Sequence, residues 1–322
     1  MRAGRSGTAV TVGYLHEAFL YDGVDEFVAS SVDYATEGLD EREHVVVAVL
    51  PEKIERLSTA LGDRAERVTF IDMAEAGRNP ARVIQVWRDI VDAAELRGAR
   101  VRGIGEPIWD GRTDAEISEA QLHEALLNEA FGADQPLRLR CPYDVSKLAP
   151  EVVDTARRTH AVVDDGVTRE PSALFSPDVL VGRGFTTPLA APNAVGETVY
   201  YTVDELSALR QIVEDFARRN GARPAGAEAL MLAVQEIAAN TVRHGGGAGT
   251  LRAWVDGDAL VCELRDSGRI EESMVGRLRP GPNREDGRGI WLANQLCDLV
   301  QIRSDGEGTV VRLHVRLPDT VS

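Results

Sequence analysis

The chain of 322 residues has few cysteines, and no two of them are spaced as a pair. The three are Cys141, Cys262 and Cys297, and none belongs to a CxxC motif. A sparse and odd number of cysteines is typical of a reducing compartment. We therefore expect a cytoplasmic protein with neither a disulfide framework nor a zinc site.

Aromatic residues are also scarce, at 5% of the chain, beside 43% hydrophobic and 27% charged residues. These fractions are normal for a globular protein and exclude wholesale disorder or a fibrous repeat. The length is too great for one ordinary core and suits two domains.

Basic residues are in deficit, with 36 Lys and Arg against 52 Asp and Glu and a formal net charge of −16. Because binding to phosphates requires a basic surface, this charge argues against a nucleic-acid binder and against docking on an anionic membrane. Apolar runs such as 45–50 are far shorter than the ~20 residues that cross a bilayer. The charged N-terminus has no apolar stretch behind it, so we expect no signal peptide.

A change of composition divides the chain. Residues 171–196 contain four prolines and three glycines, which is typical of a linker. We predict an N-terminal domain at 1–170, a linker at 171–196 and a C-terminal domain at 197–322. Most of the acidity falls on the first part, because residues 195–322 carry 15 Arg and 19 Asp or Glu, a net charge of only −4.

The first part alternates strand and helix signals. Apolar runs predict strands at 45–50, 67–72, 101–105 and 137–141, and helical spacing predicts helices at 80–96 and 115–131. Strands that alternate with helices predict an α/β domain with a mostly parallel sheet. Neither GxxxxGK[ST] nor GxGxxG occurs, so a standard phosphate loop is excluded.

The second part has two helices followed by strands. A capping box at 202–205 opens the first predicted helix, and Pro224 opens a second that runs to about Arg243. Strands are predicted at 251–255 and 259–265, followed by a helix at 289–296 and a hairpin around 305–306. This order predicts an α+β two-layer sandwich with one antiparallel or mixed sheet.

Four short segments of the second part carry polar residues or glycines. The first is EIAANTVRH at 236–244, on the second predicted helix. Residues four apart lie about 40° apart around a helix axis, so Glu236, Asn240 and His244 share one face. A carboxylate there suits a general base, and an amide oxygen suits a hard cation such as Mg²⁺. The alternative for this segment alone is a solvated face that ends in an ordinary histidine.

The other three segments are weaker on their own. In Asp266-Ser-Gly268 an acceptor for an exocyclic amino group ends a strand, and the glycine lets the backbone approach a ring. Gly287-Arg288-Gly289 opens a helix whose N–H groups can receive phosphate oxygens. Gly308-Thr309 enters the last strand. Each is also an ordinary turn, helix start or hairpin end.

In this order the four segments resemble the Bergerat-fold ATPases, the superfamily of gyrase, heat-shock chaperones, histidine kinases and MutL. More narrowly, they resemble the anti-sigma-factor serine kinases. The resemblance spans 199–317 and implies that the chain binds ATP and Mg²⁺, with Glu236 as general base and Asn240 as the Mg²⁺ ligand. The chain departs from the pattern at Ile270, where a second glycine often stands. The ATP-binding residues that the resemblance implies are Asn240, His244, Asp266, Gly268, Gly287, Arg288, Gly289 and Thr309.

The first part resembles the MEDS sensory domain, which is similar to RecA-like sheets but lacks their phosphate loop. The residues that carry this resemblance are HEAFLY at 16–21, Gly105-Glu106-Pro107, HEALLN at 123–128 and Cys141-Pro-Tyr143. It implies that the N-terminal domain senses a signal, with a small molecule as one candidate. We expect this domain to fold on its own.

Together the resemblances imply a signal-responsive serine/threonine kinase that controls transcription through a sigma factor or an anti-sigma antagonist, without contacting nucleic acid or membrane. A homodimer is compatible with the sequence. One alternative is a sensor histidine kinase, for which His123-Glu124 and His16-Glu17 offer the usual dipeptide of a phosphoacceptor histidine. Against it, His123 lies far ahead of the ATPase motifs, and no proline follows it in the expected position. Another is a binding module that uses ATP to set its affinity for a partner, without phosphotransfer.

Overall fold

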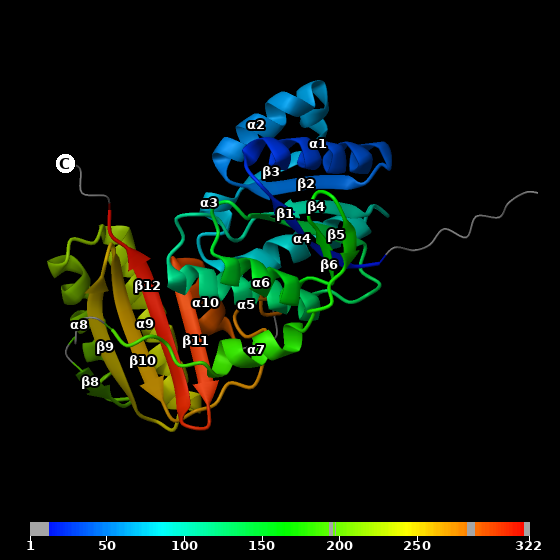
Figure 1. The fold of residues 1–322 in the computed structure, drawn as a ribbon. Coiled ribbons are helices and arrows are strands. Elements are labelled where there is room, and N and C mark those ends of the chain that lie inside the picture. The colour runs from blue at the N-terminus through cyan, green and yellow to red at the C-terminus, as the bar shows by residue number, and fades with distance from the viewer. Residues whose placement is uncertain (1–12, 193–195, 197, 282–286, 319–322) are drawn as a thin grey trace, which may run out of the picture. The chain divides into compact units, whose positions relative to one another are not determined.

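The computed structural model describes residues 13–192, 196, 198–281 and 287–318. Its internal contacts divide the chain into two compact units (Figure 1). Unit 1 runs to Asp72 and includes Arg88–Trp109 and Asn128–Phe175, whereas unit 2 comprises Met73–Trp87, Asp110–Leu127 and the residues from Ser176 onward. Two stretches of the first 130 residues therefore group with the C-terminal part. The division at 171–196 stays a prediction, and 193–195 of that segment lie outside the described residues.

Unit 1 is built on a seven-stranded sheet with the order β3-β2-β4-β5-β1-β6-β7. The pairings from β3 to β6 are parallel, and β7 pairs antiparallel with β6, which confirms the predicted mostly parallel sheet. The strands are β1 (Leu15–Tyr21), β2 (His44–Val49), β3 (Thr69–Asp72), β4 (Val101–Gly105), β5 (Leu137–Asp144), β6 (Val162–Asp164) and β7 (Arg169–Pro171).

Four helical segments belong wholly to unit 1: α1 (Val24–Asp40), α2 (Pro51–Leu61), η1 (Gly62–Arg67) and α6 (Pro150–Thr159). Two more, α4 (Val83–Glu95) and α5 (Asp114–Ala130), contain residues of both units. Pro51 and Pro150 occupy the first turns of their helices, where the missing N–H costs nothing. An apolar cluster that includes Phe19, Phe27 and Val47 packs α1 and α2 onto the sheet.

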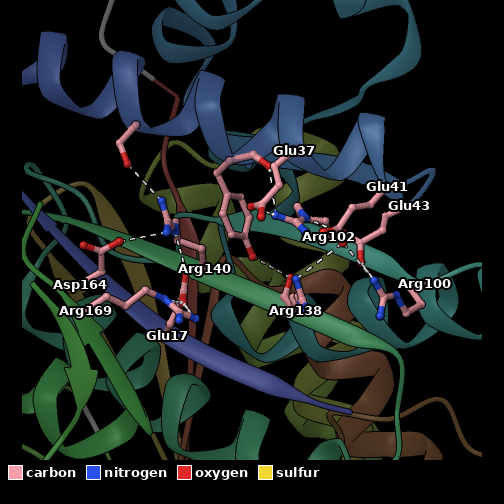
Figure 2. A network of polar contacts seen from close by, with 12 residues as sticks. Glu17, Glu37, Glu41, Glu43, Arg100, Arg102, Arg138, Arg140, Asp164 and Arg169 are labelled. Carbon is pink, nitrogen blue, oxygen red and sulfur yellow. Dashed lines mark hydrogen bonds and ion pairs between the residues drawn. The ribbon is translucent and has the colours of Figure 1, made fainter. Parts of the chain in front are cut away.

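Unit 1 also contains a network of buried charges (Figure 2). Arg102 on β4 is 1% exposed and is paired with Glu43 and with Glu37. Gly38 gives it room, because a Cβ there would come within 2.6 Å of the Arg102 Cδ. Since a buried charge requires a paired and hydrogen-bonded partner, the carboxylates on α1 and before β2 fix this arginine.

A second buried arginine extends the network along β5 (Figure 2). The Arg140 Nε lies 2.6 Å from Glu17 Oε1, and its Nη2 lies 3.0 Å from Asp164 Oδ2. The guanidinium lies 4.2 Å from the centre of the Tyr34 ring, on which Arg102 also stacks at 4.9 Å. One aromatic ring of α1 therefore contacts both arginines.

Unit 2 contains a five-stranded antiparallel sheet with the order β11-β12-β10-β9-β8. Helices α8, α9 and α10 accompany it, which confirms the predicted two-layer sandwich (Figure 1). The strands are β8 (Thr198–Tyr201), β9 (Gly249–Asp256), β10 (Ala259–Asp266), β11 (Leu299–Asp305) and β12 (Gly308–Arg316). The helical segments are α3 (Met73–Ala76), η2 (Pro80–Arg82), α7 (Pro177–Thr186), α8 (Leu206–Arg219), α9 (Pro224–His244) and α10 (Arg288–Leu296).

Two expectations about this part need correction. The segment 171–196 was predicted to lack regular structure, but it contains α7, whose Val181 is buried. Gly184 allows this helix to contact Leu122, since a Cβ there would come within 2.6 Å of Leu122 Cδ1. The capping residues 202–205 do form hydrogen bonds between Thr202 and Glu205, but helix α8 begins only after them, at Leu206.

Among the described residues, no helix combines the length and the apolar character that a membrane span requires.

We expect Arg102→Met to destabilise the protein by about 3–5 kcal/mol, because it breaks the buried pair with Glu43 and leaves that carboxylate to Arg100, which is 37% exposed. Urea unfolding followed by circular dichroism measures this loss. The matched control is Arg64→Met, which breaks the exposed 3.3 Å pair with Asp40 and should cost no more than about 1 kcal/mol. Equal effects of the two substitutions would contradict a structural role for the buried pair.

Candidate functional site

Helix α9 carries the first group of candidate residues. Its apolar residues, including Leu230, Val234 and Ile237, are buried in the core of unit 2. Glu236 and Asn240 are half-buried, and His244 is the last, exposed residue of the helix. The polar stripe predicted from the spacing is therefore present, with its third member at the helix terminus.

The start of helix α10 meets this stripe. Gly287 caps the helix in the left-handed conformation, with φ of 86°, and Arg288 is exposed. A Cβ added to the buried Gly289 would stand 2.9 Å from Asn240 Nδ2 and 3.1 Å from Glu236 Oε2. Only glycine therefore allows this approach without displacing those side chains. The first turn of a helix presents amide N–H groups that lack intrahelical acceptors, which is a favourable environment for phosphate oxygens.

Asp266 ends β10 and is held by two donors. Its Oδ2 accepts a hydrogen bond of 2.7 Å from Thr241 Oγ1, and its Oδ1 accepts one of 2.8 Å from the Gly268 amide. Tyr201 in turn donates to Thr241 Oγ1 at 3.0 Å. Burial, partly offset by the Thr241 bond, raises the pKa of Tyr201 to about 12, so this phenol stays protonated and remains a donor. A carboxylate oxygen can accept more than one hydrogen bond, so each retains capacity for a further donor.

The last candidate segment supports the loop that follows Asp266. Thr309 is 5% exposed, and its hydroxyl donates to the Gly268 carbonyl at 2.9 Å. It also lies 2.9 Å from Ser304 Oγ, which accepts a 2.8 Å bond from the Ile270 amide. The side chain of Ile270, at the position where a second glycine was expected, is half-buried and packs against the core.

Helix α9 connects the two groups of residues. Asn240 contacts the start of α10, while the next residue, Thr241, reaches Asp266 on the sheet side. The loop after β10 returns to the helix terminus, where Ser267 donates to the Gly245 carbonyl at 3.0 Å. Asp286, which directly precedes Gly287-Arg288-Gly289, lies outside the described residues.

Sequence reasoning missed three residues that orient this site: Tyr201, Thr241 and Ser304. Thr241 stands beside Asn240 in the sequence, but nothing in a single chain shows that its hydroxyl orients the Asp266 carboxylate. Tyr201 ends a short strand that the sequence reading did not identify. A residue that only orients a site residue by a hydrogen bond does not have to stand at a fixed spacing from it in the sequence, so motif spacing does not reveal it.

The described residues fit Mg·ATP, the ligand that the resemblance implies. The side-chain oxygens of Asn240 and Glu236 are the type that Mg²⁺ takes, and they adjoin a helix start suited to phosphates. A buried donor chain orients a carboxylate that can accept from an amino group.

Comparison with known proteins identifies both parts of the chain. The model of the MEDS family, described as a methanogen/methylotroph, DcmR sensory domain, matches residues 15–161. The model of the histidine kinase-like ATPase domain matches residues 200–315. No curated protein matches the chain.

Two solved structures show only distant similarity. The crystal structure of the RsbU and RsbW domains of Rv1364c from Mycobacterium tuberculosis is 16% identical with a TM-score of 0.28, over 38% of this chain and 32% of that one. The chain thus covers about a third of that protein. The Acinetobacter baumannii histidine kinase AdeS is 9% identical with a TM-score of 0.22, over 54% of this chain and 87% of that one. Both TM-scores are below 0.5, so the fold assignment depends on the family models and on the strand order.

The two family matches confirm the resemblance of the first part to the MEDS domain and of the second part to the superfamily that includes the histidine kinases. They agree with the mostly parallel sheet of unit 1 and the antiparallel sheet of unit 2. The chain joins a MEDS sensory domain to a histidine kinase-like ATPase domain.

Proposed function

We propose that the C-terminal domain binds Mg·ATP and acts as a protein serine/threonine kinase of the anti-sigma-factor type. Its substrate would be a serine or threonine of an anti-sigma antagonist, and the MEDS domain would sense the signal, with a small molecule as the candidate ligand. A sigma factor is the second expected partner, so that the protein would control transcription through protein contacts alone. The acidic net charge of −16 supports protein partners over nucleic acid.

The observation that carries the proposal is the contact of Gly289 with Asn240 and Glu236. It joins a helix N-terminus to one amide and one carboxylate. Phosphoryl transfer depends mainly on positioning and on charge neutralisation around the phosphates. A helix start, an oxygen ligand and a base at one place are the parts that this chemistry uses.

The roles follow from the chemistry of each group. Asp266 would accept a hydrogen bond from the adenine amino group, and the first-turn amides of α10, with Gly287 and Arg288, would hold the phosphates. When bound, Mg²⁺ would neutralise phosphate charge, with Asn240 as its protein ligand. Glu236 would take the proton of the substrate's serine or threonine hydroxyl. The oxygen of that hydroxyl would form a bond to the γ-phosphorus while the bond from the γ-phosphorus to ADP breaks and ADP leaves. His244 and Thr309 would border the nucleotide through the helix terminus and the Gly268 loop.

The adenine contact is tested with Asp266→Asn. We expect ATP affinity measured by calorimetry to fall about 10- to 100-fold, because a hydrogen bond to a charged acceptor contributes about 1.5–3 kcal/mol. The control is Asp305→Asn, since Asp305 likewise accepts a bond from the amide two residues on, at 2.8 Å, but lies in a hairpin turn. Unchanged affinity in Asp266→Asn, with the fold intact, would contradict the adenine assignment.

The general base is tested with Glu236→Gln. We expect phosphotransfer to a co-encoded antagonist to fall about 10²–10⁴-fold, while ATP affinity is retained. Asn240→Ala should lose both phosphotransfer and ATP binding, because it removes the proposed Mg²⁺ ligand. Glu228→Gln, an exposed glutamate two turns earlier on α9, is the control and should retain full activity.

The same assay separates the alternatives. An acid-stable label on serine or threonine supports the kinase, and an acid-labile label on histidine would instead support the sensor histidine kinase. If the unsubstituted protein binds ATP but labels no residue, the result would support the binding module that uses ATP without phosphotransfer. Full transfer by Glu236→Gln would contradict the role of Glu236 as base.

A further inference from the structure

Three side chains of the MEDS domain converge on one face of its sheet. His16 lies on β1, Cys141 on the neighbouring β5, and His160 directly after α6. Cys141 is paired across the strands with Ala18, two residues from His16, and alternate residues of a strand share a face. All three side chains are at most 1% exposed.

The distances among them fit a shared ion. His16 Nε2 lies 3.4 Å from Cys141 Sγ, and the two imidazole rings are 3.9 Å apart between centres. One ligand atom from each of the three residues lies within 4.8 Å of the others. In a tetrahedral zinc site with Zn–N of about 2.0 Å and Zn–S of about 2.3 Å, nitrogen and sulfur stand about 3.5 Å apart. The observed separation already corresponds to one edge of such a tetrahedron.

The hydrogen bonds of His160 prepare it as a ligand. Its Nδ1 lies 2.8 Å from the Ala156 carbonyl, which can only accept, so Nδ1 carries the proton. This tautomer makes Nε2 the acceptor nitrogen of the ring. The Thr159 hydroxyl, 2.9 Å from the same Nδ1, supports the arrangement. A backbone carbonyl that accepts from the second nitrogen is the usual outer contact of a metal-bound histidine.

The donor set selects the kind of metal. Two imidazoles and one thiolate suit zinc and related late transition metals, whereas Mg²⁺ and Ca²⁺ require oxygen ligands. We propose that the MEDS domain binds one zinc ion through His16, Cys141 and His160. The sequence excluded a zinc site because it offers no CxxC spacing, but this cluster draws its ligands from three separate segments. Binding requires the thiolate, so Cys141 would release its proton when the metal enters.

The test uses the full chain, with Zn²⁺ and Co²⁺ as the probes. After dialysis against each metal, the unsubstituted protein should carry one ion per chain, and the cobalt form should show thiolate-to-cobalt absorption in the near ultraviolet. Cys141→Ala should abolish that band and weaken zinc affinity by more than about 100-fold, beyond the effect of losing an outer-shell contact. Cys262→Ala is the matched control, since Cys262 is also a buried cysteine, on β10 of the ATPase domain, and it should bind as the unsubstituted chain does.

His160→Gln gives an independent check, because it removes a nitrogen ligand and keeps the thiol. We expect the thiolate band to shift or vanish and zinc affinity to fall at least tenfold. Circular dichroism and ATP binding report whether each variant is folded. Absence of stoichiometric zinc and of the cobalt band in the unsubstituted chain would overturn the proposal, as would equal zinc binding by Cys141→Ala.

Discussion

The packing of helix α9 on the antiparallel sheet is the constraint on which the candidate nucleotide site depends. Burial of Leu230, Val234 and Ile237 fixes the rotation of the helix about its axis. With that rotation set, Asn240 contacts the start of α10 and Thr241 contacts Asp266. A shift of one residue turns a helix by about 100°, and it would remove both contacts together. The hydrophobic core thus positions the polar groups of the site.

The MEDS domain divides its chemistry between the two faces of one strand. Along β5, Arg138 and Arg140 alternate with Leu139 and Cys141. On the arginine face, Arg140 pairs with carboxylates of β1 and β6 (Figure 2). It also stacks on Tyr34 of α1. The opposite face places Cys141 beside His16. Because strand residues alternate between faces, a change of register by one residue would mix the charged network with the cluster of histidines and cysteine.

The elements that the sequence predicted well are those with a strong apolar pattern, such as β2, β4 and α9. Strand β1 was missed because His16 and Glu17 interrupt its apolar run. Both have partners that are distant in sequence: Cys141 for His16, and Arg140 and Arg169 for Glu17. Helix α7 was missed because Gly182, Gly184 and the nearby prolines are typical of a loop, whereas contact with Leu122 stabilises a helix. The order of the four ATPase motifs was readable, but the Tyr201–Thr241–Asp266 chain depends on tertiary contacts.

Two glycines of the ATPase domain show which features a sequence reveals and which depend on the fold. Gly289 and Gly308 were recognised as motif positions, yet their reasons are contacts that only the fold defines. A Cβ at Gly308 would come within 2.2 Å of the Asp266 carbonyl, and its φ of 133° is one that other residues rarely adopt. A Cβ at Gly289 would displace Asn240 and Glu236. The two glycines therefore bring β12 against the end of β10 and α10 against α9. Because Gly289 stands in the first turn of α10, its close approach to Asn240 and Glu236 would set the amide groups of that turn beside these two side chains, where the proposed nucleotide would meet them.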